Sequence, residues 1–284
     1  MKTASSKRKQ PKRQLRREEA VRQIYRTLSE AWGPQHWWPA ESPFEVIVGA
    51  ILTQNTSWTN VERAIAKLRE ADALHMAGIR NLSASELEEL VRSSGYFRQK
   101  AERLKAFVAF VDSRYGGSLE TMLSTPVLEL RSELLGINGV GPETADSILL
   151  YSGLQPIFVV DTYTRRVLDR HGIISGSSRY EEIRELVERA LKEEAPRQLE
   201  PGKLSPERPA VHVASTMSMV QQSCLARVYN EMHGLFVQVG KHYCHKALPH
   251  CEVCPLGSML SFKQLQALRN SAPVGPLKAV RSSS

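Results

Sequence analysis

Apolar residues recur at helical spacing along most of this chain, and this periodicity constrains the fold more than any other feature. It is clear at 87–91, 104–111 and 127–134, and it resumes after residue 162. The run most typical of a strand, 156–160, has no partner strand to satisfy its backbone, so we expect an extended connector there. The sequence therefore predicts an all-α fold.

Capping residues indicate where several helices begin. Ser42 is followed by Pro43, and Ser83 is followed three positions later by Glu86, which are patterns typical of helix N-termini. Because glycines divide the apolar pattern into short segments, we expect six to seven helices between residues 42 and 153. The segment 197–215 is rich in proline and charge and predicts a surface loop.

The net charge of +8 is concentrated at the N-terminus. Residues 1–17 hold eight of the 38 Lys and Arg residues and no acid, so 30 basic and 30 acidic residues remain in the rest of the chain. A segment this polar cannot fold alone. We expect a disordered tail that binds phosphate or an acidic surface, or that only aids solubility or localisation.

The sequence lacks the features of a membrane or exported protein. Its densest apolar stretch, 44–52, is about half as long as a membrane span requires. No apolar segment follows the N-terminal positive charges, so we expect neither membrane insertion nor export. Four cysteines in such a chain indicate reduced thiols or metal ligands rather than disulfides.

Residues 134–150 contain the most informative motif. Gly139, Val140 and Gly141 lie between two helical patterns, and Pro142 can begin the second helix. The free amides and positive dipole end of such a helix start suit a phosphate. An ordinary connection between two helices would, however, use similar residues.

Asp161 lies eighteen residues after Glu143, at the start of another helical pattern. Its simplest role is that of an N-cap. The apolar residues before it would nevertheless place the carboxylate where water is scarce. There its charge would stabilise a cationic sugar far better than in bulk water.

These two stretches, GINGVGPETA and VVDTYTRRV, resemble the helix-hairpin-helix and Gly/Pro-Asp signature of the endonuclease III superfamily of DNA glycosylases. The resemblance covers about residues 20–256 and implies a two-lobed helix-hairpin-helix-GPD glycosylase fold with a C-terminal cysteine loop. It implies that Asp161 is catalytic and that the hairpin holds a DNA phosphate, with a monovalent cation, through Gly139, Val140, Gly141 and Thr144. The expected parts are a basic tail (1–17), a six-helix domain with the hairpin (42–155), a second helical domain ending in the cysteine loop (18–41 plus 156–258) and a C-terminal tail (259–284).

Glu143 occupies the position at which family members that also nick the DNA strand carry a lysine. A carboxylate cannot form a Schiff base with the sugar C1′. We therefore expect a monofunctional glycosylase that uses water and has no AP lyase activity.

Trp37, Trp38, Pro39 and Phe44 place three large aromatic side chains within eight residues. Core packing or a hydrophobic staple onto the first helix would explain them. A flipped purine, however, also needs flat surfaces on which to stack. The segment resembles the base pocket of the endonuclease III-like 3-methyladenine DNA glycosylases, which implies alkylated purines as substrates; these bases carry positive charge and leave readily.

Gln54 matches a family glutamine that fills the gap left in the duplex by the flipped nucleotide, and capping of the helix end is the alternative. Further along, Arg98, Lys100, Arg103 and Lys105 would either contact the DNA backbone or form a solvated helix face.

Cys244, Cys251 and Cys254 reproduce the first three ligands of the family's iron-sulfur loop, but Leu260 stands in the fourth position. A [4Fe-4S] cluster is normally held by four thiolates. Three outcomes stay open. His245 or His250 completes the cluster, the loop binds zinc through three cysteines and one histidine, or packing alone holds the loop.

The sequence thus predicts a base excision repair enzyme that acts as a monomer on damaged double-stranded DNA. We expect it in the cytoplasm, associated with the bacterial nucleoid. One alternative is an endonuclease III-like glycosylase and AP lyase for oxidised or mismatched bases. The other is a non-catalytic helix-hairpin-helix DNA-binding protein, which would have no need of a carboxylate at Asp161.

Overall fold

All regular structure in the described part of the chain is helical. The computed structural model describes residues 4–195 and 214–270, and the side chains of 12–195 and 214–268. Within these ranges no strand is present, so the all-α prediction is confirmed. The loop expected over 197–215 lies outside the described residues except for its last two positions.

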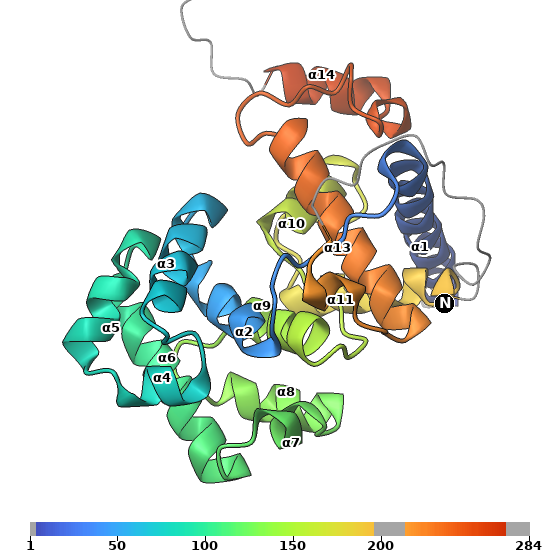
Figure 1. Cartoon of the computed structure of the whole chain (residues 1–284). Helices are drawn as coiled ribbons and strands as arrows, with labels where there is room; N and C mark the ends of the chain where they lie inside the picture. The colour runs from blue at the N-terminus through green and yellow to red at the C-terminus, as the bar shows by residue number, and fades with distance from the viewer. Residues whose placement is uncertain (1–3, 196–213, 271–284) are drawn as a thin grey trace, which may run out of the picture.

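The helices fall into two groups along the chain (Figure 1). The first group begins with the N-terminal helix and consists of α1 (Ala4–Trp32), α2 (Pro43–Leu52), α3 (Trp58–Glu70), α4 (Met76–Asn81), α5 (Ala84–Leu90), η1 (Arg92–Ser94), α6 (Phe97–Tyr115), α7 (Leu119–Leu123), α8 (Val127–Leu135), α9 (Pro142–Ser147) and η2, a π-helical turn (Ile148–Ser152). The second group is α10 (Thr162–Arg170), α11 (Tyr180–Leu191), α12 (Thr216–Met219), α13 (Cys224–His242), η4 (Gly257–Met259) and α14 (Phe262–Asn270).

Two lobes meet at α2, η2 and α13. Helices α3 to α8 lie together on one side of the molecule, and α1 lies on the other side against α11 and α13 (Figure 1). Helix α2 packs on α3, α6, α9 and η2, and η2 in turn contacts α13. The chain therefore brings its N-terminal helix back onto its C-terminal half.

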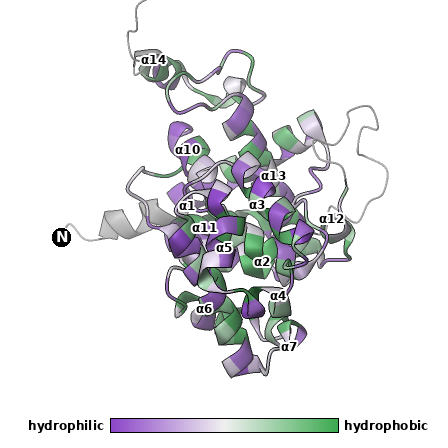
Figure 2. Ribbon diagram, turned by 60° about the vertical axis from the view of Figure 1, so that its left-hand side comes forward, coloured by the Kyte–Doolittle hydropathy of each residue, from purple (hydrophilic) through white to green (hydrophobic). Residues whose placement is uncertain are grey.

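A single hydrophobic core runs through both lobes. Helix α2 is almost entirely buried, and its ribbon is coloured mostly hydrophobic in Figure 2. This explains why its sequence is apolar throughout rather than on one face, since both lobes pack against it.

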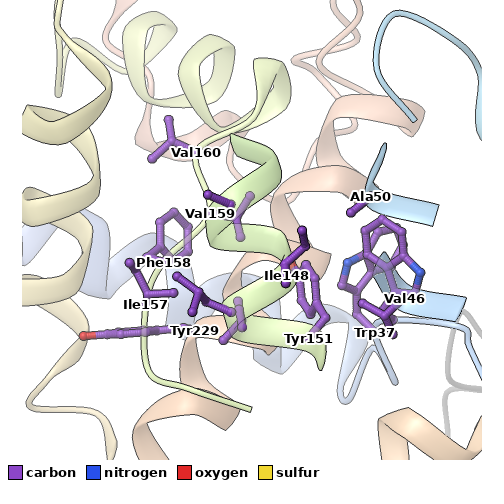
Figure 3. Close-up of a cluster of buried hydrophobic side chains, with 14 of the residues drawn as sticks. Trp37, Val46, Ala50, Ile148, Tyr151, Ile157, Phe158, Val159, Val160 and Tyr229 are labelled. Carbon is purple, nitrogen blue, oxygen red and sulfur yellow. The ribbon is translucent and has the colours of Figure 1, made fainter. Parts of the chain in front are cut away.

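The expected extended connector is present between η2 and α10. Ile157, Phe158, Val159 and Val160 are all buried beside the core residues of η2 (Figure 3). Side chains replace the missing strand partner: the amide of Phe158 donates to Glu188 Oε1 at 3.0 Å, and that of Val160 donates to the Tyr180 hydroxyl at 3.2 Å. The backbone is thereby satisfied without a sheet.

Both predicted helix starts are confirmed. The Ser42 hydroxyl accepts from the Glu45 amide at 3.2 Å, and Ser83 with Glu86 forms a complete capping box. The number of helices was underestimated, because residues 42–153 contain eight α-helices instead of the expected six to seven. Two of them, α4 and α7, have six and five residues and are too short to show a period of 3.6.

The two predicted tails differ from the structure. Helix α1 begins at Ala4, so most of the segment expected to be a disordered tail is helical. Lys, Arg and Gln are good helix formers, and a helix propagates easily from a packed segment such as Val21–Leu28. The C-terminal segment 259–284 likewise contains α14 within its described part. None of the described helices is long and apolar enough to span a membrane.

Candidate active site

The hairpin between α8 and α9 has the backbone that its glycines predicted. Gly139 has φ +80°, and a Cβ there would lie 2.2 Å from Arg103 Nε. Any other residue would therefore be strained and would displace Arg103. Val140, by contrast, is buried and anchors the hairpin through its amide, which donates to the Ile137 carbonyl at 3.0 Å.

Several hairpin amides have no acceptor. Those of Gly139, Gly141 and Glu143 donate to no other described residue, and they lie at the start of α9, where an anion is favoured. The carbonyls of Ile137 and Gly139 already accept hydrogen bonds, from Val140 and Gln54. Each carbonyl oxygen keeps a second lone pair, so the monovalent cation that the resemblance implies stays a prediction.

Gln54 is bound to this hairpin. Its Nε2 donates to the Gly139 carbonyl at 3.0 Å and to Thr144 Oγ1 at 2.8 Å, and its Oε1 accepts from Arg103. The residue thus joins the end of α2 to the hairpin. Capping of α2 by Gln54 is not seen, because the Thr53 hydroxyl and amide bond the Gly49 carbonyl instead. The role of Gln54 at the duplex stays a prediction.

The basic residues on α6 are not a simple DNA-binding face. Lys100 is buried, and its Nζ donates to the carbonyls of Leu52 and Ser94 at 2.9 and 2.6 Å. Burial lowers the pKa of this amine to about 8, with a further contribution from Arg103. Lys105 donates to the carbonyls of Arg80 and Leu82. Lys100 was therefore wrongly expected to face either DNA or solvent, whereas Lys105 is only half-buried.

Asp161 is both a helix cap and a buried carboxylate. It is the N-cap of α10, and its Oδ1 accepts from the Thr164 amide at 2.7 Å. It is also 9% exposed, at the end of the buried connector. Its second oxygen, Oδ2, lies 3.7 Å from His233 Nε2. The carboxylate is therefore fixed on one side and surrounded by little water.

His233 and Tyr151 behind this carboxylate were missed in the sequence. The Tyr151 hydroxyl lies 2.6 Å from His233 Nδ1, and both side chains are buried. Burial lowers the pKa of His233, although the charge of Asp161 opposes this shift. A histidine and a tyrosine on apolar helical stretches usually belong to the core, so the sequence alone gave no reason to connect them with Asp161.

Glu143 lies close to Asp161. The surrounding protein and the charge of Asp161 raise the pKa of Glu143 to about 7, while Arg165 acts in the opposite direction. The side chain nevertheless remains accessible to solvent. A glutamate thus stands beside the aspartate in the position where a lysine was considered.

The two tryptophans lie in the core between the lobes. Trp37 and Trp38 are 7% and 6% exposed; Trp38 packs on Trp58 and Tyr151, and the Trp37 ring lies 6.1 Å from that of His233. Trp37 and Tyr151 are neighbours in Figure 3. Phe44 is buried at the start of α2, and Pro39 is half-buried. The core-packing interpretation therefore holds for the two indoles, which also lie close to the catalytic candidate.

Lys241 covers part of this region. Its Nζ lies 5.9 Å from the centre of the Trp37 ring, and its side chain is exposed. The sequence gave no hint of this contact, because Lys241 lies 80 residues beyond Asp161 at the end of α13. An amine is thus close to Trp37, although it is not in the hairpin.

A charged network joins the hairpin to the second lobe. Asp146, on α9, is buried and accepts from Arg131 at 2.6 and 3.1 Å and from the Tyr180 hydroxyl at 2.8 Å. Arg131 also donates to Glu181 on α11 at 2.7 Å. Breaking such a pair would leave an uncompensated buried charge, so the network fixes how the hairpin sits on α11.

The cysteines share one small cavity. Cys244, Cys251 and Cys254 line it together with Leu260 and His171, whereas His245 and His250 pack edge-to-face on each other and do not line it. The nitrogens of His171 lie 2.9 and 3.4 Å from the carbonyls of Val167 and Leu256. The expectation that His245 or His250 completes a cluster is therefore not supported.

These residues do not fit a four-ligand metal centre. Leu260 offers no ligand atom, and no group of three or more His, Cys, Asp or Glu side chains in the described ranges is placed to hold a metal ion. Burial raises the pKa of Cys254 to about 11, with the nearby Cys244 and Cys251 adding to the effect. Arg170 donates to Cys244 Sγ at 3.1 Å, so the loop is held by protein contacts.

A shallow groove lies elsewhere, between α6 and the hairpin. It is lined by residues such as Phe110, Arg114 and Ile137. None of its lining residues belongs to the group around Asp161, so it takes no part in the chemistry considered below.

Comparison with known proteins identifies the family. Residues 48–193 match the HhH-GPD superfamily of base excision DNA repair proteins. A protein of Methanocaldococcus jannaschii that carries the name DNA repair glycosylase is 42% identical over 84% of this chain and 94% of its own length. Endonuclease III of Thermotoga maritima is 28% identical over 78% of this chain and 83% of its own length.

A solved structure agrees with these relatives. The 3-methyladenine DNA glycosylase of H. pylori, bound to 1,N6-ethenoadenine, is 28% identical and superposes with a TM-score of 0.62 over 79% of this chain and 97% of that protein. The matched residues 48–193 include both the hairpin and Asp161. The chain belongs to the HhH-GPD superfamily of base excision DNA repair proteins.

Proposed function

We propose that this protein is a monofunctional DNA glycosylase that flips alkylated purines out of damaged double-stranded DNA and releases them by hydrolysis. The observation that carries the proposal is the position of Asp161: its carboxylate is largely buried at the start of α10 and is held by the Thr164 amide. Glu143, rather than a lysine, is beside it.

The chemistry requires little of the protein beyond charge and position. An N-alkylated purine is already cationic and leaves as a neutral base with the bonding electrons of the N-glycosidic bond. Positive charge then develops on the deoxyribose, where Asp161 stabilises it, and stabilisation is strong because the site holds little water. Water adds its oxygen to C1′ and gives up a proton to the medium.

The hairpin is the part of the protein that binds the DNA backbone. The amides of Gly139, Gly141 and Glu143 offer donors for a backbone phosphate at the start of α9. Val140 and Thr144 are buried beneath them and fix the turn. We expect Gln54, which is already bound to this turn, to reach the duplex beside the flipped nucleotide.

Two observations favour alkylated purines. Trp37 and Trp38 lie beside the Tyr151–His233 pair that faces Asp161, and Phe44 and Pro39 belong to the same region of chain. The similar H. pylori protein is named a 3-methyladenine glycosylase and holds a modified adenine. The flexible side chain of Lys241 would swing away from the Trp37 ring to open it to the base.

Strand cleavage is not expected because Glu143 cannot form a Schiff base. The relationship to endonuclease III leaves a glycosylase and AP lyase for oxidised or mismatched bases as the main alternative. Lys241 is the amine that would have to serve in that case, although it lies over Trp37 rather than on the hairpin. No step is assigned to the cysteine loop or to a metal.

A panel of lesion-bearing duplexes tests the proposal. Each duplex carries a methylated purine, ethenoadenine, an oxidised pyrimidine or a mismatch, and strand breaks are scored before and after alkali. We expect breaks at alkylated purines, and only after alkali. Breaks before alkali would contradict the monofunctional mechanism, and release of oxidised pyrimidines alone would contradict the substrate class.

A further inference from the structure

His233 and Tyr151 form a buried polar pair directly behind Asp161. His233 lies on α13 and Tyr151 on η2, and they are 5% and 2% exposed. Nδ1 of the imidazole is 2.6 Å from the Tyr151 oxygen, whereas Nε2 makes no hydrogen bond and points toward Asp161 Oδ2 at 3.7 Å. Buried polar atoms without a partner are rare and require an explanation.

The surroundings of the ring decide which nitrogen carries the proton. A neutral imidazole has one N–H and one lone pair. If Nδ1 carried the proton, Nε2 would turn its lone pair toward a carboxylate oxygen, which is repulsive where no water intervenes. If Nε2 carries it, the N–H faces Asp161, and Nδ1 accepts from the Tyr151 hydroxyl.

The Tyr151 hydroxyl supports the second arrangement. It is buried and lies 2.6 Å from Nδ1, so its hydrogen has an acceptor there when Nε2 carries the imidazole proton. The contacts then run from Tyr151 through His233 to Asp161.

We propose that His233 is a positioning residue for Asp161, fixed by Tyr151 in the tautomer whose Nε2–H holds the aspartate Oδ2 while the Thr164 amide holds Oδ1. A carboxylate held at both oxygens cannot rotate away from the sugar. The separation of 3.7 Å is longer than a hydrogen bond, and catalytic contacts of this kind commonly tighten when substrate binds. The catalytic role of this inference rests on the proposed function.

The tautomer can be measured without any activity. Long-range ¹H–¹⁵N NMR correlations of the full-length protein, uniformly labelled with ¹⁵N, distinguish the two imidazole tautomers. We expect His233 to be the Nε2–H form, with a change in its Nε2 signal in Asp161→Asn. The Nδ1–H form would overturn the proposal. Tyr151→Phe removes the hydroxyl that donates to Nδ1 and leaves only Asp161 to favour Nε2–H, so the excess of that form should shrink; an unchanged spectrum would show that Tyr151 does not set the tautomer.

Two substitutions of His233 then test its role in the reaction. His233→Gln keeps an N–H donor near the position of Nε2, whereas His233→Met has a similar size and no donor. Because misplacement of a reacting group commonly slows a reaction by about 100-fold, we expect His233→Met to lose about 100-fold in single-turnover base release with unchanged DNA affinity. We expect His233→Gln to stay within about 10-fold of the wild type, on the same reasoning.

Controls separate positioning from stability and from the proposed function itself. Tyr229→Phe removes another buried hydroxyl, which donates to the Glu188 carbonyl at 3.1 Å, and reports the effect of such a loss on thermal stability. Wild-type activity in His233→Met, or equal losses in both His233 variants at equal stability, would overturn the proposal. If the wild type releases no base from any lesion, the proposed function fails, and the NMR tautomer still decides how His233 faces Asp161.

Discussion

Glu143 lies near enough to Asp161 for the charge of the aspartate to help raise its pKa to about 7. Two carboxyl groups that share a site cannot both be ionised without mutual repulsion. Glu143 therefore takes up a proton at a higher pH than an ordinary glutamate does.

Glu143→Gln should stabilise the protein at alkaline pH relative to the wild type. The pKa of Glu143 is about 7 in the folded protein and 4.5 for an ordinary glutamate, so the wild type loses stability as pH rises between these values. The solvent accessibility of the side chain reduces the effect to on the order of 1 kcal/mol, or about 2 °C in Tm. Thermal denaturation of both proteins at pH 5 and pH 8 measures it.

A second glutamate, Glu231, does not disturb this comparison. Burial also raises its pKa to about 7, but it is present in both proteins. Its effect therefore cancels in the difference between them. A Tm difference that is the same at both pH values would show that Glu143 does not take up a proton in this range.

Glu143→Lys should give the protein strand-cleaving chemistry. The substitution restores an amine at the hairpin beside Asp161, where it could attack C1′ and form a Schiff base. We expect a borohydride-trapped DNA adduct with this variant and none with the wild type or with Glu143→Gln. An adduct with the wild type would point to another amine, and its loss in Lys241→Ala would identify that residue.

Gly139→Ala should distort the hairpin and weaken DNA binding. The residue has φ +80°, and the new Cβ would collide with Arg103. We expect about a tenfold higher Kd for duplex DNA, equivalent to roughly 1.4 kcal/mol, and a lower Tm. Gly141→Ala is the stability comparison, because that residue has φ −91° and open space around a Cβ. Equal Tm losses in the two variants would contradict the role assigned to the backbone of Gly139.

Leu260→Cys should improve the ability of the cysteine loop to hold iron and sulfide. Leu260 lines the same cavity as the three thiols, so the substitution completes a set of four thiolates. Iron and sulfide per chain, measured after anaerobic purification, should exceed the wild-type content. Leu260→Ser controls for the smaller side chain. Equal contents in the Cys and Ser variants would show that the fourth thiol does not decide cluster binding.

Sequence reasoning succeeded where one residue or a short pattern determines the local structure. Ser42, Ser83 and Asp161 were all placed correctly at helix starts, because a cap depends on a side chain and an amide three residues apart. The positive φ of Gly139 follows from the same kind of local requirement. Short helices such as α4 and α7 were not predicted, because they contain fewer than two full turns and show no clear helical period.

The contacts behind the site depend on distant parts of the chain. Tyr151 and His233 are 82 residues apart, and each belongs to an apolar helical pattern that indicates only a core position. Lys241 contacts Trp37 across 204 residues, and His171 lines the cysteine cavity, whereas His245 and His250, the histidines considered from the sequence as ligands, do not. Such contacts between distant residues depend on how α13 packs between the lobes, and helical periodicity does not specify that packing.

Single-turnover release of a methylated purine by Asp161→Asn tests the central claim most directly. The amide keeps the size of the side chain and can still cap α10, but it carries no charge. If a carboxylate stabilises the sugar cation, base release should fall by at least about 100-fold, as expected when a charge-stabilising group is removed, with DNA affinity unchanged. Release at the wild-type rate would contradict the assignment of Asp161 as the catalytic residue.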